Sequence, residues 1–217
     1  MGNYLPICFD IENRPILIFG GGSHAYEKIE KLLPYNPALT VAAEKVTPTI
    51  KRYGEEKRIS LVKSNGTGAG ALISRLKPLF VIIADVEEEK IEGLFKACKK
   101  YGVQVNTPGH AEFSTFLFPA VIRRKNFSVA IAAFGASSAA AKWIRDYIEK
   151  ALPAATDSIL EHFGTFRQKL AEKGANLRTG KFATMYREFL DTALRENRML
   201  TAGEMTEIMT KYIEAES

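Results

Sequence analysis

Three consecutive glycines, Gly20 to Gly22, lie between a short apolar run and a segment whose apolar residues have helical spacing. With Ala25 they satisfy the pattern G-x-G-x-x-G/A, in which Gly20 and Gly22 take the first two positions. The first glycine of this pattern permits a tight turn, the second lets a pyrophosphate approach the backbone, and unpaired amides at the helix start bind the phosphates. The turn therefore predicts a dinucleotide site. A glycine turn that only reverses the chain is the alternative.

The residues after the next apolar run are expected to meet the ribose of the dinucleotide. Glu44 lies 22 residues after Gly22, near the position of the acidic residue that binds the ribose hydroxyls of NAD. Lys45 follows directly and favours NADP, and a solvated surface charge is a further alternative for Glu44. We predict NAD as the cofactor. The predicted cofactor contacts are Gly20, Gly21, Gly22, Ser23, His24, Ala25, Ala43, Glu44, Ala84 and Asp85.

Alternating strand and helix patterns surround this turn. Helical spacing predicts helices over 24–33, 49–55 and 88–101, and the glycine-rich segment 64–70 lies between two strands without a predicted helix. Strands that alternate with helices imply an α/β, Rossmann-like, doubly wound parallel sheet over residues 1–112. The apolar runs that predict its strands are 14–19, 39–43, 59–63, 79–84 and 103–105.

The pattern changes after Pro108. The β-rich runs 116–122 and 127–133 predict a hairpin, and residues 138–151 predict a helix with Trp143, Ile144 and Tyr147 available for packing. We predict a dimerisation region over 113–150 and a C-terminal helical domain over 151–217, with breaks near Gly174 and Gly203. A hairpin and helices too small for an independent core indicate burial against a second subunit, so we expect a homodimer.

Composition limits the classes of function. A chain of 217 residues with 46% hydrophobic and 25% charged residues is typical of a globular protein. No apolar run is long enough to span a bilayer and the first residues lack a basic signal, so we expect a cytoplasmic protein that binds no membrane. Cys8 and Cys98 are expected to be buried, reduced thiols.

The net charge of +5 indicates an anionic partner. Its sign alone fits a nucleic acid, a membrane surface or a polyanionic small molecule. Lysines and arginines are scattered, without a long basic run interleaved with aromatics, which favours an acidic small molecule over a nucleic acid. No dense cluster of His, Cys, Asp and Glu predicts a metal site.

The segments 5–10 and 15–22 resemble the start of the precorrin-2 dehydrogenase family of siroheme synthases, and the similarity extends over residues 3 to 150. This resemblance implies a homodimer that uses NAD to oxidise precorrin-2 to sirohydrochlorin. Some family members also insert iron (Fe2+) to give siroheme, and the tetrapyrrole substrate carries many carboxylates, which suits a basic chain. Further matching features are Lys28, Leu32, Leu33, Asn106, Phe116, Pro119, the small-residue turn 134–138 and Arg145.

The resemblance to the family and the basic charge of the chain predict which residues contact the substrate. These are Asn106, Ser137 and Arg124, with Arg123, Lys142 and Arg145 as further basic candidates. A helix N-cap is the alternative for Ser137, and solvated surface charge is the alternative for the arginines and the lysine.

The chain departs from the family where the family's usual catalytic aspartate falls on Gly109, which cannot accept a proton. His110 is therefore the predicted catalytic base, and a loop histidine without a task is the alternative. His24 and Glu27 also depart from the pattern, as does the stretch 84–87, usually Ala-Thr-Asp or Ala-Thr-Asn. We expect His24 either to face the cofactor or substrate or to replace a packing side chain.

Three functions follow. The leading one is a precorrin-2 dehydrogenase with iron insertion as a second activity. The alternative, favoured by Gly109, is a divergent dinucleotide- or tetrapyrrole-binding partner or sensor that has lost oxidation. A dehydrogenase of an unrelated substrate would explain the glycine turn but not the matches from Asn106 to Ser137.

Overall fold

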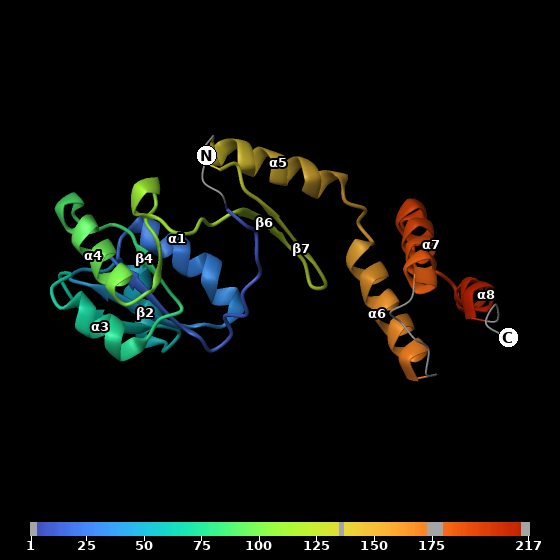
Figure 1. Ribbon diagram of the computed structural model, residues 1–217, viewed down its shortest axis with the longest axis horizontal. Coiled ribbons are helices and arrows are strands. Elements are labelled where there is room, and N and C mark those ends of the chain that lie inside the picture. Colours follow the sequence, from blue (N-terminus) through green and yellow to red (C-terminus); the bar gives the residue numbers. More distant parts are fainter. Residues whose placement is uncertain (1–3, 135–136, 173–179, 214–217) are drawn as a thin grey trace. The chain divides into compact units, whose positions relative to one another are not determined.

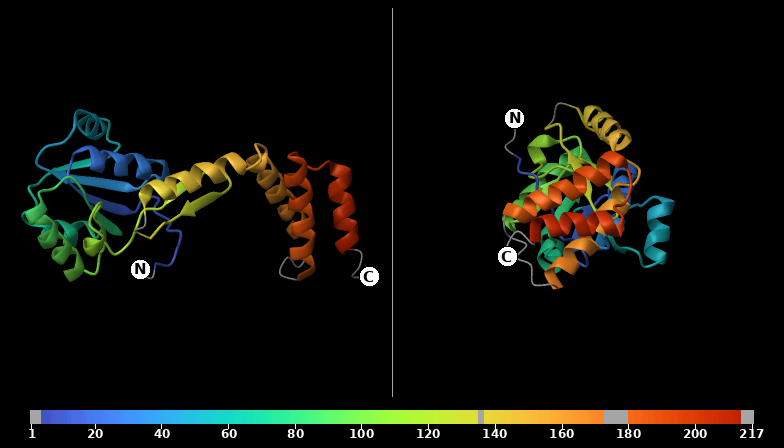
Figure 2. Two further views of the ribbon diagram at one scale, coloured as in Figure 1. Left: turned by 90° about the horizontal axis from the view of Figure 1, so that it is seen from above. Right: turned by 90° about the vertical axis from the view of Figure 1, so that its right-hand side faces the viewer.

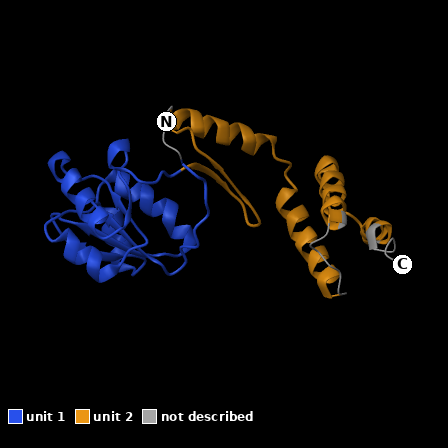
Figure 3. Ribbon diagram, viewed as in Figure 1, with its two compact units in different colours: residues 1–118 blue, residues 119–217 orange. Residues whose placement is uncertain are grey.

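The chain divides into two compact units, residues 1–118 and residues 119–217, shown in blue and orange in Figure 3. The computed structural model describes residues 4–134, 137–172 and 180–213. The first unit contains the glycine turn, and the second contains the hairpin and the C-terminal helices.

The first unit is built on a five-stranded parallel sheet with the order β3-β2-β1-β4-β5. Successive connections run outward from β1 in one direction and then, from β4, in the other. A sheet of this kind opens a crevice at the carboxyl ends of the two strands where the order reverses, here β1 and β4. The strands are β1 (Pro15–Phe19), β2 (Ala38–Ala43), β3 (Ser60–Lys63), β4 (Phe80–Ile83) and β5 (Gln104–Asn106).

Alternate side chains of β1 enter two separate cores. Ile16 and Ile18 pack with α1 (Ser23–Leu32) and α2 (Pro48–Glu55). Leu17 and Phe19 pack on the other face with α3 (Ala69–Leu76) and α4 (Glu88–Lys100). Figure 1 shows α1 on the opposite side of the strands from α3 and α4. Burial on both faces explains the continuous apolar runs, and the predicted doubly wound α/β fold is confirmed. Two short 3-10 turns are η1 (Leu33–Tyr35) and η2 (Ala111–Phe113).

Helix α3 is absent from the sequence prediction, which placed no helix between β3 and β4. It begins after Gly68, whose φ is 73°, and follows directly on the glycine-rich segment that obscured its start. Its apolar residues Ala69, Leu72, Ile73 and Leu76 have helical spacing and pack in the core of that face. Burial of this stripe outweighs the poor helix propensity of the glycines.

The second unit begins with an antiparallel hairpin of β6 (Ala120–Arg123) and β7 (Ser128–Ile131). The hairpin is confirmed, but the prediction that its first strand starts at Phe116 is wrong. Phe116 and Phe118 pack on Phe80 in the first unit, with ring centroids 5.0 and 6.2 Å away. Pro119 lacks the N–H group that a strand pairing requires, so the ladder starts after it.

Four helices complete the second unit: α5 (Ser138–Ala151), α6 (Thr156–Glu172), α7 (Gly180–Glu196) and α8 (Ala202–Ile213). The last three lie side by side in Figure 2 and bury an aromatic core that includes Phe166 and Phe189. The predicted break near Gly174 falls outside the described residues.

The predicted break near Gly203 is confirmed, since α7 ends at Glu196 and α8 begins at Ala202, although Gly203 itself lies inside α8 and does not start it. The helix starts at a capping box instead: the Thr201 N–H donates to Glu204 Oε2 at 2.7 Å, and the Glu204 N–H donates to Thr201 Oγ1 at 3.3 Å. The Arg198 guanidinium also donates to the Glu204 carboxylate. Hydrogen bonds from Arg198, and then from Thr201, lower the pKa of Glu204 to about 2.

The two cysteines differ in exposure. Cys98 on α4 is buried, as predicted, and burial raises the pKa of its thiol to about 12. The prediction for Cys8 is wrong: Cys8 is exposed, because residues 4–11 form no strand or helix and do not enter the sheet. Among the helices that the structure describes, none combines the length and the apolar character needed to cross a membrane.

The capping box at α8 makes a stability prediction. Thr201→Ala should lower the free energy of unfolding by about 1 kcal/mol, because the Glu204 N–H loses its acceptor. Chemical denaturation followed by circular dichroism measures it. Thr210→Ala, an exposed threonine of the same helix, is the matched control, and an equal loss in both variants would contradict the capping role.

Candidate cofactor and catalytic site

The predicted cofactor residues of the first unit gather at one edge of the sheet. The glycine turn follows β1, Ala84 and Asp85 follow β4, and Gly109 and His110 follow β5. Since the carboxyl ends of parallel strands share one edge, all three loops lie at the edge of the sheet where α/β folds bind their ligands.

The first two glycines of the turn are required by neighbouring backbone. Gly20 has a φ of 104°, and a Cβ there would lie 1.5 Å from the carbonyl oxygen of Ala84. A Cβ on Gly21 would lie 2.4 Å from the carbonyl oxygen of Lys45. These glycines let the turn fit between the loops after β2 and β4.

The third glycine makes room for a carboxylate. A Cβ on Gly22 would lie 2.6 Å from Cγ of Asp85. The Asp85 carboxylate accepts hydrogen bonds from the Ala25 N–H at 2.7 Å and from the His24 N–H at 3.3 Å. Residue 85 is itself in the left-handed region, with a φ of 53°. The departure from the family at this position therefore places an anion at the start of α1.

His24 contacts the same carboxylate, with Nδ1 2.7 Å from Asp85 Oδ1. The His24 side chain is 67% exposed and that of Asp85 is 17% exposed. Of the two alternatives for His24, a packing side chain is therefore wrong. Partial burial raises the pKa of Asp85, but the hydrogen bonds from Ala25 and His24 outweigh it and hold that pKa below its ordinary value of 3.8. Asp85 is thus ionised at neutral pH.

The backbone of the glycine turn suits the binding of a dinucleotide. The N-cap of α1 is Gly22, without a side-chain cap, and the first turn holds no acidic residue. Within the described part of the chain, the N–H groups of Gly21, Gly22 and Ser23 have no hydrogen-bond partner. These free groups are available to phosphates, aided by the helix dipole, and they lie next to the His24 and Ala25 N–H groups that Asp85 occupies.

The predicted ribose contact lies at the end of β2. Ala43 closes the strand half-buried, and Glu44 follows it exposed. The charge of Glu44, after the larger effect of Glu87, contributes to raising the pKa of Lys90. Lys90 thus lies near Glu44. The contact of Glu44 with the ribose stays a prediction.

His110 lies between two carboxylates. Its Nε2 is 3.4 Å from Glu88 Oε2 at the start of α4, and its Nδ1 is 3.4 Å from Glu112 Oε1. The ring also packs against Phe113, with centroids 6.2 Å apart. The sequence prediction missed Glu88, because nothing in the spacing shows that the start of α4 meets the loop after β5.

Asn106 has a structural task. It is buried, and its side-chain amide donates to the carbonyl oxygen of Phe116 at 3.0 Å, while its buried Oδ1 has no partner among the residues that the structure describes. The bond closes the loop that carries His110. The predicted substrate contact at Asn106 remains a prediction, with Oδ1 as the unused acceptor.

Ser137 and Arg124, the other predicted substrate contacts, lie in the second unit. The hydroxyl of Ser137 accepts a hydrogen bond from the Ala140 N–H at 3.2 Å, so Ser137 is the N-cap of α5. The Arg124 guanidinium pairs with Glu149 at 3.0 Å, and Arg145 pairs with Asp146. Each has an intramolecular partner, and their contacts with a substrate remain predictions.

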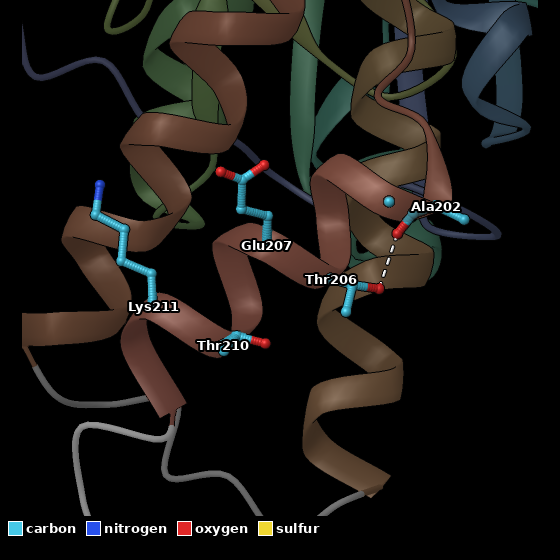
Figure 4. A pocket seen from close by; sticks show the side chains of 6 residues that line it. Ala202, Thr206, Glu207, Thr210 and Lys211 are labelled. Atoms are coloured by element: carbon cyan, nitrogen blue, oxygen red, sulfur yellow. Dashed lines mark hydrogen bonds between the residues drawn. The ribbon is translucent and has the colours of Figure 1, made fainter.

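A shallow groove lies along α8 in the second unit and is shown in Figure 4. Two of its polar groups are already paired: the Thr206 hydroxyl donates to the Ala202 carbonyl oxygen at 2.8 Å, and Lys211 pairs with Glu188. Among the described residues, no group of three or more His, Cys, Asp and Glu side chains could hold a metal ion.

Residues 7–120 match a protein family described as "Putative NAD(P)-binding". The chain belongs to this family. The matched residues include the glycine turn and the loop of His110, so its cofactor is a nicotinamide dinucleotide.

Curated relatives are siroheme synthases. That of Mannheimia succiniciproducens is 27% identical over 172 residues, covering 79% of this chain and 35% of the relative. That of Psychromonas ingrahamii is 29% identical over 171 residues, covering 78% and 35%. The chain therefore spans about a third of the length of these relatives, and the predicted relationship to siroheme synthases is confirmed.

A solved structure with a similar fold is that of "SirC, precorrin-2 dehydrogenase". Its TM-score is 0.68 at 19% identity, covering 97% of this chain and all of the other. The likeness extends over both units, so the combination of a Rossmann-like sheet, hairpin and helical tail is shown as the fold.

The close approach at Gly20 makes a second prediction. Gly20→Ala should lower the free energy of unfolding by about 3 kcal/mol or more, because the methyl group meets the Ala84 carbonyl and the φ of 104° is strained for alanine. Thermal and urea unfolding measure this loss. Gly93→Ala, in the interior of α4 with open space around it, should stabilise by roughly 0.5–1 kcal/mol. A Gly20→Ala protein as stable as wild type would contradict the geometry.

Proposed function

We propose that this protein is an NAD-dependent dehydrogenase that oxidises precorrin-2 to sirohydrochlorin. The observation that carries the proposal is the placement of the glycine turn and His110 on loops at the same edge of the sheet. The likeness to siroheme synthases and to the precorrin-2 dehydrogenase fold supports this substrate over an unrelated one.

The oxidation removes one hydride and one proton from the tetrapyrrole. NAD, when bound, supplies the acceptor for the hydride. His110 accepts the proton on its ring, and Glu88 and Glu112, each 3.4 Å from a ring nitrogen, stabilise the resulting imidazolium. In this way His110, in the loop after β5, takes the role of proton acceptor that Gly109 cannot fill.

NAD rather than NADP is supported by Glu44 at the end of β2, where a 2'-phosphate would meet a carboxylate. The net charge of +5 supports a polycarboxylate substrate.

Gly109 and the carboxylate of Asp85 at the start of α1 favour a second candidate, a dinucleotide- or tetrapyrrole-binding partner or sensor without oxidation. It predicts cofactor binding without turnover. Incubation with enzymatically generated precorrin-2 and NAD, followed by the absorbance of sirohydrochlorin, separates the two candidates.

A variant at His110 tests its role. His110→Ala should lower kcat by about 100-fold or more, because a positioned proton acceptor is lost. Gly109→Asp in the same variant should restore part of the rate, since a φ of 87° is tolerated best by Asp and Asn among residues with side chains, and the space around Gly109 is open. Stopped-flow rates over a pH range measure both. A His110→Ala enzyme with an unchanged rate would contradict the proposed base.

Iron insertion is a second proposed activity, supported by the likeness to siroheme synthases. Here Fe2+ is a substrate that the tetrapyrrole nitrogens bind, so the protein needs no metal cluster of its own. Conversion of sirohydrochlorin and Fe2+ to siroheme above the uncatalysed rate supports it, and equality with that rate contradicts it.

We also propose a homodimer formed through α5. Trp143 and Tyr147 are 67% and 64% exposed, and their rings stack with centroids 5.6 Å apart. Ile144 of the same helix and Val121 of β6 are exposed apolar residues as well. An apolar patch of this kind is typical of an interface with another protein chain.

Combined substitution of Trp143→Ser and Tyr147→Ser should convert the dimer to a monomer, measured by light scattering after size-exclusion chromatography. Met199→Ser, at an exposed apolar residue outside α5, should leave the dimer intact. A wild-type protein that is monomeric at about 100 μM, well above the Kd of a stable dimer, would refute the interface.

A further inference from the structure

The start of α1 is hydrogen-bonded to an anion supplied by another part of the chain. Asp85 is 60 residues from Ala25 in sequence, yet its carboxylate accepts from the Ala25 N–H and the His24 N–H. The helix has no cap of its own, because Gly22 has no side chain and the first turn has no acidic residue. The Asp85 carboxylate therefore accepts hydrogen bonds at the start of α1 and balances the positive end of its dipole, as a bound phosphate does in a dinucleotide site.

The carboxylate also lies in the space that the second glycine of the pattern keeps free. A Cβ on Gly22 would be 2.6 Å from Asp85 Cγ and 2.9 Å from its Oδ2. In dinucleotide-binding turns a pyrophosphate approaches the backbone at this glycine. Two anions that approach the same backbone repel each other, so the carboxylate and the phosphates exclude each other at this position.

We propose that Asp85 is an internal competitor of the cofactor, and that the dinucleotide binds by displacing this carboxylate from the N–H groups of His24 and Ala25. The inference rests on the proposed dehydrogenase function and assigns Asp85 the control of cofactor affinity. It also replaces the sequence prediction that Asp85 is a contact of the cofactor.

The surroundings of Asp85 allow the exchange. It lies in the loop between β4 and α4, and its side chain, not its backbone, accepts the hydrogen bonds from the start of α1. The ring of His24 is largely exposed and 2.7 Å from the carboxylate, so it offers the displaced group a partner outside the turn. Without the dinucleotide, the Asp85 carboxylate caps α1. With the dinucleotide bound, a phosphate takes the place of that carboxylate.

Two substitutions remove the competitor without straining the loop. Asp85→Asn and Asp85→Gly both tolerate the φ of 53°, because asparagine and glycine adopt the left-handed region most readily. Glu89→Gln is the matched control, since it removes one exposed carboxylate from the first turn of α4.

Calorimetry with NADH, ADP-ribose and adenosine measures the effect. The dissociation constants of NADH and ADP-ribose should fall at least about tenfold in both Asp85 variants, and those of adenosine should not change, because adenosine has no phosphate. Glu89→Gln should bind all three as wild type does. If Asp85→Asn fails to fold, Asp85→Gly provides the same comparison.

The outcomes separate this inference from the proposed function. Unchanged or weaker binding of NADH by the Asp85 variants overturns the competition and leaves the cofactor assignment standing. Failure of wild type and every variant to bind NADH at about 1 mM overturns both.

Discussion

The N–H groups of His24 and Ala25 at the start of α1 are paired with an anion, and the rest of the site depends on this pairing. The helix starts at Gly22 without a side-chain cap, at the point where the sheet order reverses between β1 and β4. Unpaired N–H groups at a helix start carry a partial positive charge that either a phosphate or a carboxylate can neutralise. In this protein Asp85 does so.

The three glycines serve this arrangement in different ways. Gly20 and Gly21 let the turn pass close to the backbone of Ala84 and Lys45, so they are needed whether or not a ligand is bound. Only Gly22 leaves space for an anion. A glycine-rich pattern therefore combines a folding requirement with a binding requirement, which explains why the motif predicted the cofactor family although two of its glycines are structural.

Patterns local in sequence predicted most of the fold. Apolar runs fixed the five strands, because strands buried on both faces need continuous apolar residues. Helix α3 was missed because glycines precede its apolar stripe, and the capping box of Thr201 and Glu204 that starts α8 was not part of the prediction, which gave only a break near Gly203.

Contacts between distant segments could not be predicted in the same way. The pairing of Asp85 with the start of α1 and that of His110 with Glu88 both join loops from different strands, and each depends on side-chain directions at the sheet edge. The sequence nominated Asp85, His24 and His110 as site residues, but only the structure gives them partners.

We infer that a dinucleotide and Asp85 use the same N–H groups of α1. A crystal structure of the protein with NAD bound tests it most directly. We expect phosphate oxygens within hydrogen-bond distance of the His24 and Ala25 N–H groups, with the Asp85 carboxylate turned away from them. A bound NAD whose phosphates lie elsewhere, with Asp85 still bonded to Ala25, would contradict it.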